Sequence, residues 1–132
     1  MYRPRRIDLV AAGAIALPTL AALAVWPRLP ETLAIHWQGR TPDNYATKSV
    51  AVFGTALFGV AAIAFVRLAP PWATSTPGGD DIAVLGTGIT IAWVQAIVVV
   101  WNLGYRFDVM LATLPLLAAV GLLILAGLRG WR

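Results

Sequence analysis

The sequence contains no cysteine, a single histidine and few charged residues. The absence of cysteine excludes disulfide bonds, thiolate metal sites and cysteine nucleophiles. Charged residues make up 12% of the chain and hydrophobic residues 59%, whereas a soluble domain carries about 25% charged and about 45–50% apolar residues. With a mean hydropathy of +0.76, this composition excludes an ordinary soluble globular domain.

Asp, Glu, Lys, Arg and His are all missing from four long runs, which cover residues 9–27, 49–66, 82–105 and 109–128. Each run is close to the roughly 20 residues that cross the hydrocarbon core of a bilayer. The longest segment between runs, residues 28–48, is too short to bury a core of its own. The sequence therefore predicts an all-α, polytopic membrane protein with four transmembrane helices.

We expect residues 1–132 to form one domain, a compact bundle of four helices. The predicted spans cover about residues 7–27, 49–68, 82–104 and 109–128, and an ordered external loop at 28–48 joins the first two. The apolar region of a signal peptide has about 7–15 residues, and the first run is longer than that. We therefore expect the first helix to remain in the protein and not to be cleaved as a signal peptide.

Small residues at four-residue spacing predict close packing between these helices, because they let two backbones approach. They are Ala12 and Ala16, then Ala51, Thr55 and Gly59, then Gly88, Ala92 and Ala96. A homo-oligomer is an alternative use of the same surfaces.

The basic residues predict the orientation, because cytoplasmic loops carry an excess of Lys and Arg. If the N-terminus is cytoplasmic, the inner basic residues are Arg3, Arg5, Arg6, Arg67, Arg129 and Arg132, and the outer ones are Arg28, Arg40, Lys48 and Arg106. The larger inner group includes the cluster before the first helix, which usually dominates topology. We therefore expect a multi-pass protein of the cell membrane with both termini cytoplasmic.

The four runs lack the ionisable residue that ion-coupled transporters usually keep inside the membrane. Their strongest polar side chain is that of Gln95, which we expect to form hydrogen bonds between helices. A small transporter or channel, or an assembly subunit of a larger membrane complex, is therefore an alternative and not the leading hypothesis. Nucleic acid is not an expected partner, because the basic residues behind the net charge of +4 are spread over every segment between spans.

Polar chemistry is concentrated in the predicted external loop, residues 28–48, which contains the only histidine, His36. Gly39 permits a positive φ, and residues 42–44 predict a turn. Before these, residues 33–37 favour an extended segment that lies across the mouth of the bundle.

The motifs of this loop resemble those of a known family. In order, they are Leu29-Pro30, Ile35-His36-Trp37, Gly39, Pro42-Asp43 and Lys48, directly after the first predicted span. Over about residues 7–66 the chain resembles the domain-of-unknown-function 1648 family, a membrane domain also found in SdpI-type immunity proteins. The resemblance implies a multi-helix integral membrane protein whose relatives protect against a secreted toxic peptide and help to signal its presence.

The same loop supplies the candidate residues for binding a ligand or partner. They are Pro30, His36, Trp37, Gly39, Pro42, Asp43 and Lys48. We expect His36 and Lys48 to hold the loop through hydrogen bonds to loop carbonyls or to Asp43, with a reach toward lipid headgroups as the alternative for Lys48. Trp37 either lies at the membrane interface or anchors a partner.

Metal binding and catalysis are weaker interpretations of His36. Glu31, Asp43 and Asp108 offer carboxylates for a weak divalent site, but one histidine without cysteine excludes a closed zinc site from one chain. A catalytic base needs an oriented nucleophile, and no such motif accompanies His36. We therefore expect no enzyme activity, no metal and no cofactor. The leading hypothesis is a recognition module in the lipid bilayer, related to immunity or signalling, whose loop binds a peptide, a lipid or a membrane-protein partner.

Overall fold

The computed structural model describes residues 3–70, 72 and 79–129. Its elements follow the chain in this order: α1 (Arg6–Ala24), the 3₁₀ turn η1 (Trp26–Arg28), β1 (Thr32–Gln38), β2 (Thr41–Thr47), α2 (Lys48–Leu68), α3 (Gly79–Asn102) and α4 (Val109–Leu128). The four α-helices are long and apolar enough to cross a membrane. The four predicted spans therefore correspond to α1–α4, with end points that differ by up to three residues.

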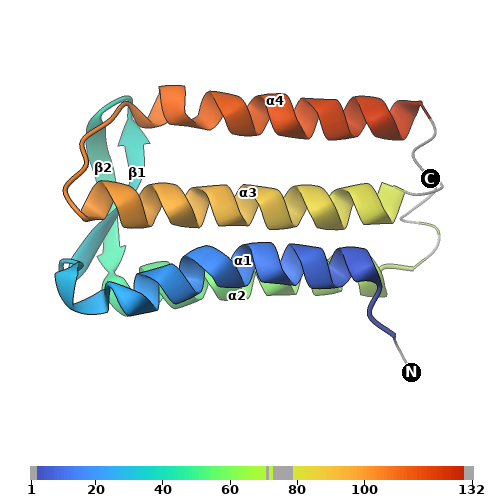
Figure 1. The fold of residues 1–132 in the computed structure, drawn as a ribbon, viewed down its shortest axis with the longest axis horizontal. Coiled ribbons are helices and arrows are strands. Elements are labelled where there is room, and N and C mark those ends of the chain that lie inside the picture. Colours follow the sequence, from blue (N-terminus) through green and yellow to red (C-terminus); the bar gives the residue numbers. More distant parts are fainter. Residues whose placement is uncertain (1–2, 71, 73–78, 130–132) are drawn as a thin grey trace.

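Helix α3 is the central element of the fold. Figure 1 shows α3 between α4 on one side and α1 on the other, with α2 behind α1. Among the described elements, α4 packs extensively only against α3 and β1, whereas α1, α2 and α3 pack against one another. The expected compact bundle is therefore formed by α1, α2 and α3. Helix α4 is peripheral, because neither α1 nor α2 packs extensively against it.

Two glycines let the three packed helices approach closely. A Cβ atom at Gly88 of α3 would lie 2.8 Å from the Cα atom of Ala11 in α1, and one at Gly59 of α2 would lie 2.8 Å from the side chain of Ile15. The prediction that small residues mediate packing is confirmed at these glycines. It is wrong for Ala12 and Ala16, which are exposed, because α1 turns the face of Ala11 and Ile15 toward α3.

The segment between α1 and α2 is not helical, so the all-α prediction is wrong there. Strands β1 and β2 form an antiparallel two-stranded sheet, which lies across one end of the helices (Figure 1). We call this the hairpin end. The expected extended segment at 33–37 is confirmed within β1.

The turn of the hairpin lies at Gly39 and Arg40, and the expected positive φ of Gly39 is confirmed at 63°. The turn predicted at residues 42–44 is wrong, because these residues lie in β2, where Pro42 pairs with Trp37 and Asn44 with His36, and Asp43 lies at a register shift between them. The ladder shifts its register between Ala34 and His36. This irregularity occurs next to the point where α3 contacts the edge of β1.

The opposite end of the bundle carries a buried ionic cluster. The guanidinium of Arg67 lies 2.7 Å from Asp8 and 2.6 Å from Asp81, and thereby joins α2 to α1 and α3. Arg5 also contacts Asp81 at 3.1 Å. Asp8 and Arg67 lie outside the charge-free runs but inside the helices, because α1 and α2 extend beyond those runs at this end.

Part of the sequence-based prediction falls outside the described residues. This applies to Arg132, which the orientation argument counts among the inner basic residues.

Candidate functional site

Lys48 fixes the base of the hairpin, where β2 passes into α2. Its ammonium donates hydrogen bonds to the carbonyl oxygens of Trp26 at 3.0 Å and Leu29 at 3.4 Å. It also lies 3.6 Å from a carboxylate oxygen of Glu31 and 4.9 Å from the ring of Trp26. The side chain is only 9% exposed. The expected hydrogen bond to a loop carbonyl is confirmed at Leu29, whereas no ion pair with Asp43 forms among the described residues. The two carbonyls lie in η1 and directly after it, and that of Trp26 also accepts from the N–H of Leu29.

Asn102 fixes the middle of β1 from the last position of α3. Its side-chain oxygen accepts a hydrogen bond from the backbone N–H of Ala34 at 2.9 Å, and its side-chain nitrogen donates to the carbonyl of Ala34 at 3.0 Å. The same nitrogen donates to the carbonyl of Val98 at 2.7 Å. Ala34 and Asn102 are both buried, so the outer edge of β1 is hydrogen-bonded here in place of a third strand.

The tip of the hairpin is attached to α4. The backbone N–H of Val109, the first residue of α4, donates to the carbonyl of Gly39 at 2.9 Å. Asp108 caps the same helix by accepting from the N–H of Leu111 at 3.2 Å. The hairpin is therefore held at its base, middle and tip.

The solvent-facing side of the hairpin is organised around Asp43. His36 Nδ1 lies 2.5 Å from one oxygen of Asp43, and the side chain of Gln38 donates to the other at 3.2 Å. The hydrogen bond from His36 holds the pKa of Asp43 below its ordinary value of 3.8. The charge of His36 and the Gln38 hydrogen bond add to this shift, while desolvation opposes it. His36 itself remains 67% exposed.

The opposite side of β1 packs onto aromatic residues of α3. The rings of Trp37 and Trp101 meet edge to face at 5.5 Å between centroids. Arg106 stacks over the Trp101 ring at 3.8 Å and donates to the Trp101 carbonyl at 3.0 Å. The indole N–H groups of both tryptophans are buried and have no hydrogen-bond partner among the described residues. Buried indole N–H groups usually find an acceptor.

A cavity of about 420 Å³ lies beneath β1 and between α3 and α4. His36, Trp37 and Gly39 line its upper part. Its other walls consist of Val94 and Ile97 from α3 and of Val109, Met110 and Thr113 from α4, with Val109 and Met110 at the hairpin end of that helix. We call it the sub-hairpin cavity. The Thr113 hydroxyl donates to the Met110 carbonyl at 2.6 Å.

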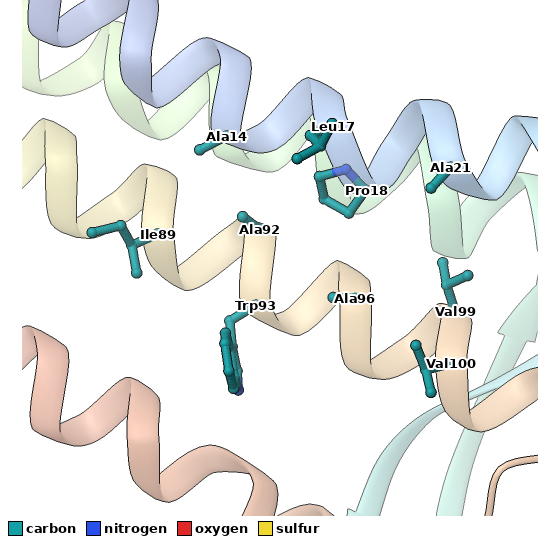
Figure 2. Close-up of a pocket in the computed structure, with 10 residues that line it drawn as sticks. All are labelled: Ala14, Leu17, Pro18, Ala21, Ile89, Ala92, Trp93, Ala96, Val99 and Val100. Atoms are coloured by element: carbon teal, nitrogen blue, oxygen red, sulfur yellow. The ribbon is translucent and has the colours of Figure 1, made fainter.

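Two further cavities are lined almost wholly by apolar residues. One, of about 460 Å³, lies between α1 and α3. Figure 2 shows the small side chains of Ala14 and Pro18 across from Ala92 and Ala96 at this cavity, while Trp93 points away toward α4. The predicted stripe residues Ala92 and Ala96 therefore line a groove. The other cavity, of about 480 Å³, lies between α2 and α3 and also borders the hairpin.

Gln95 forms the polar centre of the three packed helices. Its side-chain nitrogen donates to the Val52 carbonyl at 2.9 Å and to the Thr19 hydroxyl at 3.3 Å. The predicted hydrogen bonds between helices are thereby confirmed. The Gln95 side-chain oxygen is buried and has no partner among the described residues.

The structure brings five of the seven candidate residues into one neighbourhood, since Pro42 lies opposite Trp37 in the strand ladder. His36 pairs with Asp43, and it lines the sub-hairpin cavity together with Trp37 and Gly39. Pro42 is half-buried in β2, and Pro30 is exposed before β1. Lys48 lies apart from this group, at the base of the hairpin.

Sequence reasoning missed Asn102 and Trp101 as partners of the hairpin, and Arg106 as the partner of Trp101. Only weak signals point to Asn102 and Arg106: one is a polar residue at the end of an apolar run, and the other is a charge in the short turn before α4. Across residues 3–70, 72 and 79–129, no group of three His, Cys, Asp or Glu residues is placed to hold a metal ion.

Residues 13–65 match a family model described as Domain of unknown function (DUF1648). The matched segment runs from α1 through the hairpin and most of α2. Neither the curated proteins nor the solved structures contain a match to the chain.

Proposed function

Because residues 13–65 of this multi-pass membrane protein form a DUF1648 domain, we propose that the domain presents its hairpin as a recognition element on the outer face of the cell membrane. The partner is a peptide or an exposed segment of a membrane protein. Both termini then lie in the cytoplasm, as the distribution of basic residues favours. Protection against a toxic peptide, which the resemblance to SdpI-type proteins implies, would be one case of such recognition.

The observation that supports this proposal is a rigidly attached hairpin with an exposed polar face. Lys48, Asn102 and Val109 hold its base, middle and tip through hydrogen bonds. The pair of His36 and Asp43 meanwhile remains on the surface. A binding surface that is ordered in advance loses less conformational entropy when its partner binds. A hairpin with only a linking role would not need three separate attachments.

Photo-crosslinking in native membranes tests this proposal. A photoreactive aromatic amino acid replaces Tyr45, which is 55% exposed on β2, with and without His36→Ala. A discrete protein or peptide adduct that is lost with His36→Ala is expected. The control places the same probe at Leu128, an exposed residue at the opposite end of the bundle. Adducts only to lipid or to the chain itself, or equal capture at both positions, would overturn recognition by the hairpin.

The orientation has its own test, since the chain contains no cysteine. A single cysteine at Thr41, which is exposed on β2, is the sole thiol for a membrane-impermeant reagent. Labelling of intact cells is expected. Labelling only after the membrane is opened would place the hairpin in the cytoplasm.

A further inference from the structure

We infer that the sub-hairpin cavity binds one acyl chain of an anionic phospholipid, whose headgroup phosphate lies against His36 and Trp37. This inference does not depend on the proposed protein or peptide partner. The two proposals share His36, but the acyl chain lies in the cavity beneath β1 and not on the exposed face of the hairpin.

The depth of the cavity favours an acyl chain. Val94 lies eight residues before the end of α3 at Asn102, which corresponds to about 12 Å along a helix. The lower wall of the cavity is therefore at the level of lipid hydrocarbon if α3 spans the membrane. Val94 and Ile97 present only apolar groups there. The Thr113 hydroxyl is already bonded to the Met110 carbonyl.

The hydrogen bonding of β1 disfavours a peptide in the same cavity. A peptide held by a strand edge needs free backbone groups. The carbonyl of Gly39 already accepts from Val109, and both backbone groups of Ala34 are bonded to Asn102. An acyl chain has no backbone N–H or C=O groups and therefore needs no free hydrogen-bond partners on β1.

One residue of the cavity lining, Trp37, carries a hydrogen-bond donor that no described residue satisfies. The indole N–H of Trp37 is buried without a partner among the described residues. The Nδ1 atom of His36 faces Asp43, which leaves the other ring nitrogen for an external group. Phosphate and ester oxygens are acceptors that suit an indole donor.

Charge at the hairpin end favours a negative headgroup. Arg40, next to Gly39, is exposed and forms no ion pair with the described residues. Asp43 and Asp108 keep their negative charges but are held in hydrogen bonds to His36, Gln38 and the N–H of Leu111. The basic residues of the hairpin end, Arg28, Arg40, Lys48 and Arg106, still outnumber its acids, Glu31, Asp43 and Asp108. The net charge at this end is therefore positive and attracts an anionic phosphate.

The test uses the purified full-length protein in vesicles that contain a phosphatidylglycerol with a photoreactive group in its acyl chain. A phosphatidylcholine with the same chain serves as the parallel probe. We expect phosphatidylglycerol adducts to concentrate on α3 near Val94 and Ile97 and on α4 near Thr113. The substitution Met110→Trp should abolish them, because it fills the mouth from a position that is 66% exposed and therefore does not disturb a core.

Two variants complete the experiment. Leu117→Trp makes a matched change at a 63% exposed position on α4 outside the cavity, and adducts should persist in it. Trp37→Phe retains the ring but removes the donor, and should weaken phosphatidylglycerol labelling by between about twofold and tenfold, the effect of one lost hydrogen bond.

Three outcomes would overturn the inference. The first is an even spread of adducts over the apolar surface that Met110→Trp does not change. The second is equal labelling by the two lipids, which would show that the protein does not prefer an anionic headgroup. The third is a peptide adduct from a photoreactive residue at position 110 in native membranes. Since the vesicles contain no protein partner, failure of this test leaves the Tyr45 crosslinking result unaffected, and the reverse also holds.

Discussion

The side-chain amide of Asn102 hydrogen-bonds to both backbone groups of Ala34, across 68 positions of the sequence. A single side chain thereby takes the place of a neighbouring strand and attaches β1 to the end of α3. Edge strands with open N–H and C=O groups tend to pair with other chains. The Asn102 contact both closes part of this edge and sets the position of the hairpin over the helices.

Replacing Asn102 with leucine should detach the middle of β1. Leucine is similar in size to asparagine but apolar, so the substitution leaves the buried N–H and C=O groups of Ala34 without partners. We expect the free energy of unfolding in detergent to fall by about 2–4 kcal/mol, and hydrogen exchange to accelerate across β1. Val100→Leu, an exposed change on the same helix, is the control. Unchanged exchange at Ala34 in Asn102→Leu would show that the amide does not hold the strand.

Lys48→Met should loosen the base of the hairpin. The variant keeps the apolar stem but removes the donors to the carbonyls of Trp26 and Leu29. We expect a loss of about 1–3 kcal/mol in unfolding free energy, measured by denaturant titration in detergent. Glu31→Gln should leave the unfolding midpoint unchanged, because the Glu31 side chain is 95% exposed. An equal effect of the two variants would mean that the ion pair, and not the carbonyl contacts, is what matters.

The helices of this fold follow from local sequence, whereas the hairpin depends on distant contacts. Four apolar runs are sufficient to predict α1–α4, because only helices satisfy every backbone group within one span. Within β2, however, Pro42, Asp43 and Asn44 are residues that strands disfavour and turns prefer. Their pairing with β1 instead relies on tertiary anchors such as Asn102, which no local pattern reveals.

The candidate site was predictable in the same uneven way. The positive φ at Gly39 follows from residue type, and contact between His36 and Asp43 was among the expected interactions. The hydrogen bond from Lys48 to a loop carbonyl was also among the expected interactions, and the contact with Leu29 confirms it. How deeply Lys48 is buried was not predictable, because a lysine at the start of a span usually extends toward headgroups. Its burial depends on how η1 turns the Trp26 and Leu29 carbonyls toward it.

Gly88→Ala should separate α1 from α3. The new methyl group would lie 2.8 Å from the Cα atom of Ala11, and backbone cannot move aside as a flexible side chain can. Overpacking of this kind costs about 1–3 kcal/mol, so we expect a lower thermal midpoint in detergent. The matched control is Gly86→Ala on the same helix, where a Cβ atom meets nothing within 4 Å. Equal midpoints for the two variants would contradict the close approach of the helices.

The hairpin should lose order in acid because of Asp43. The folded-state pKa of Asp43 is lowered from 3.8, chiefly by the hydrogen bond from His36. A lowered folded pKa stabilises the folded state at pH values above 3.8, and this contribution disappears as the pH falls through the lowered pKa. A spin label on a single cysteine at Thr41 should therefore become more mobile below pH 3.8.

The Asp43→Asn variant is the control for this titration. Its spin label should show the higher mobility throughout the same pH range, because an amide has no proton to gain. A parental label with constant mobility between neutral pH and well below 3.8 would show that the pair does not order the hairpin.

Substitution of Arg67 should lower the unfolding free energy more than any other substitution at the end opposite the hairpin. Its side chain is 6% exposed and contacts Asp8 and Asp81, so Arg67→Met leaves two buried or half-buried carboxylates without their shared cation. Removing one member of a buried ion pair costs about 3–5 kcal/mol, and we expect a loss of that order in unfolding free energy in detergent. Adding Asp8→Asn and Asp81→Asn to Arg67→Met should recover part of this loss, because both carboxylates that lost the Arg67 contact are then neutral. Arg129→Met, at an exposed position after α4, should leave the unfolding free energy unchanged. A triple variant less stable than Arg67→Met alone would contradict this prediction. The carboxylates would then stabilise this end of the bundle independently of Arg67, and the ionic cluster would not be the element that joins α1, α2 and α3.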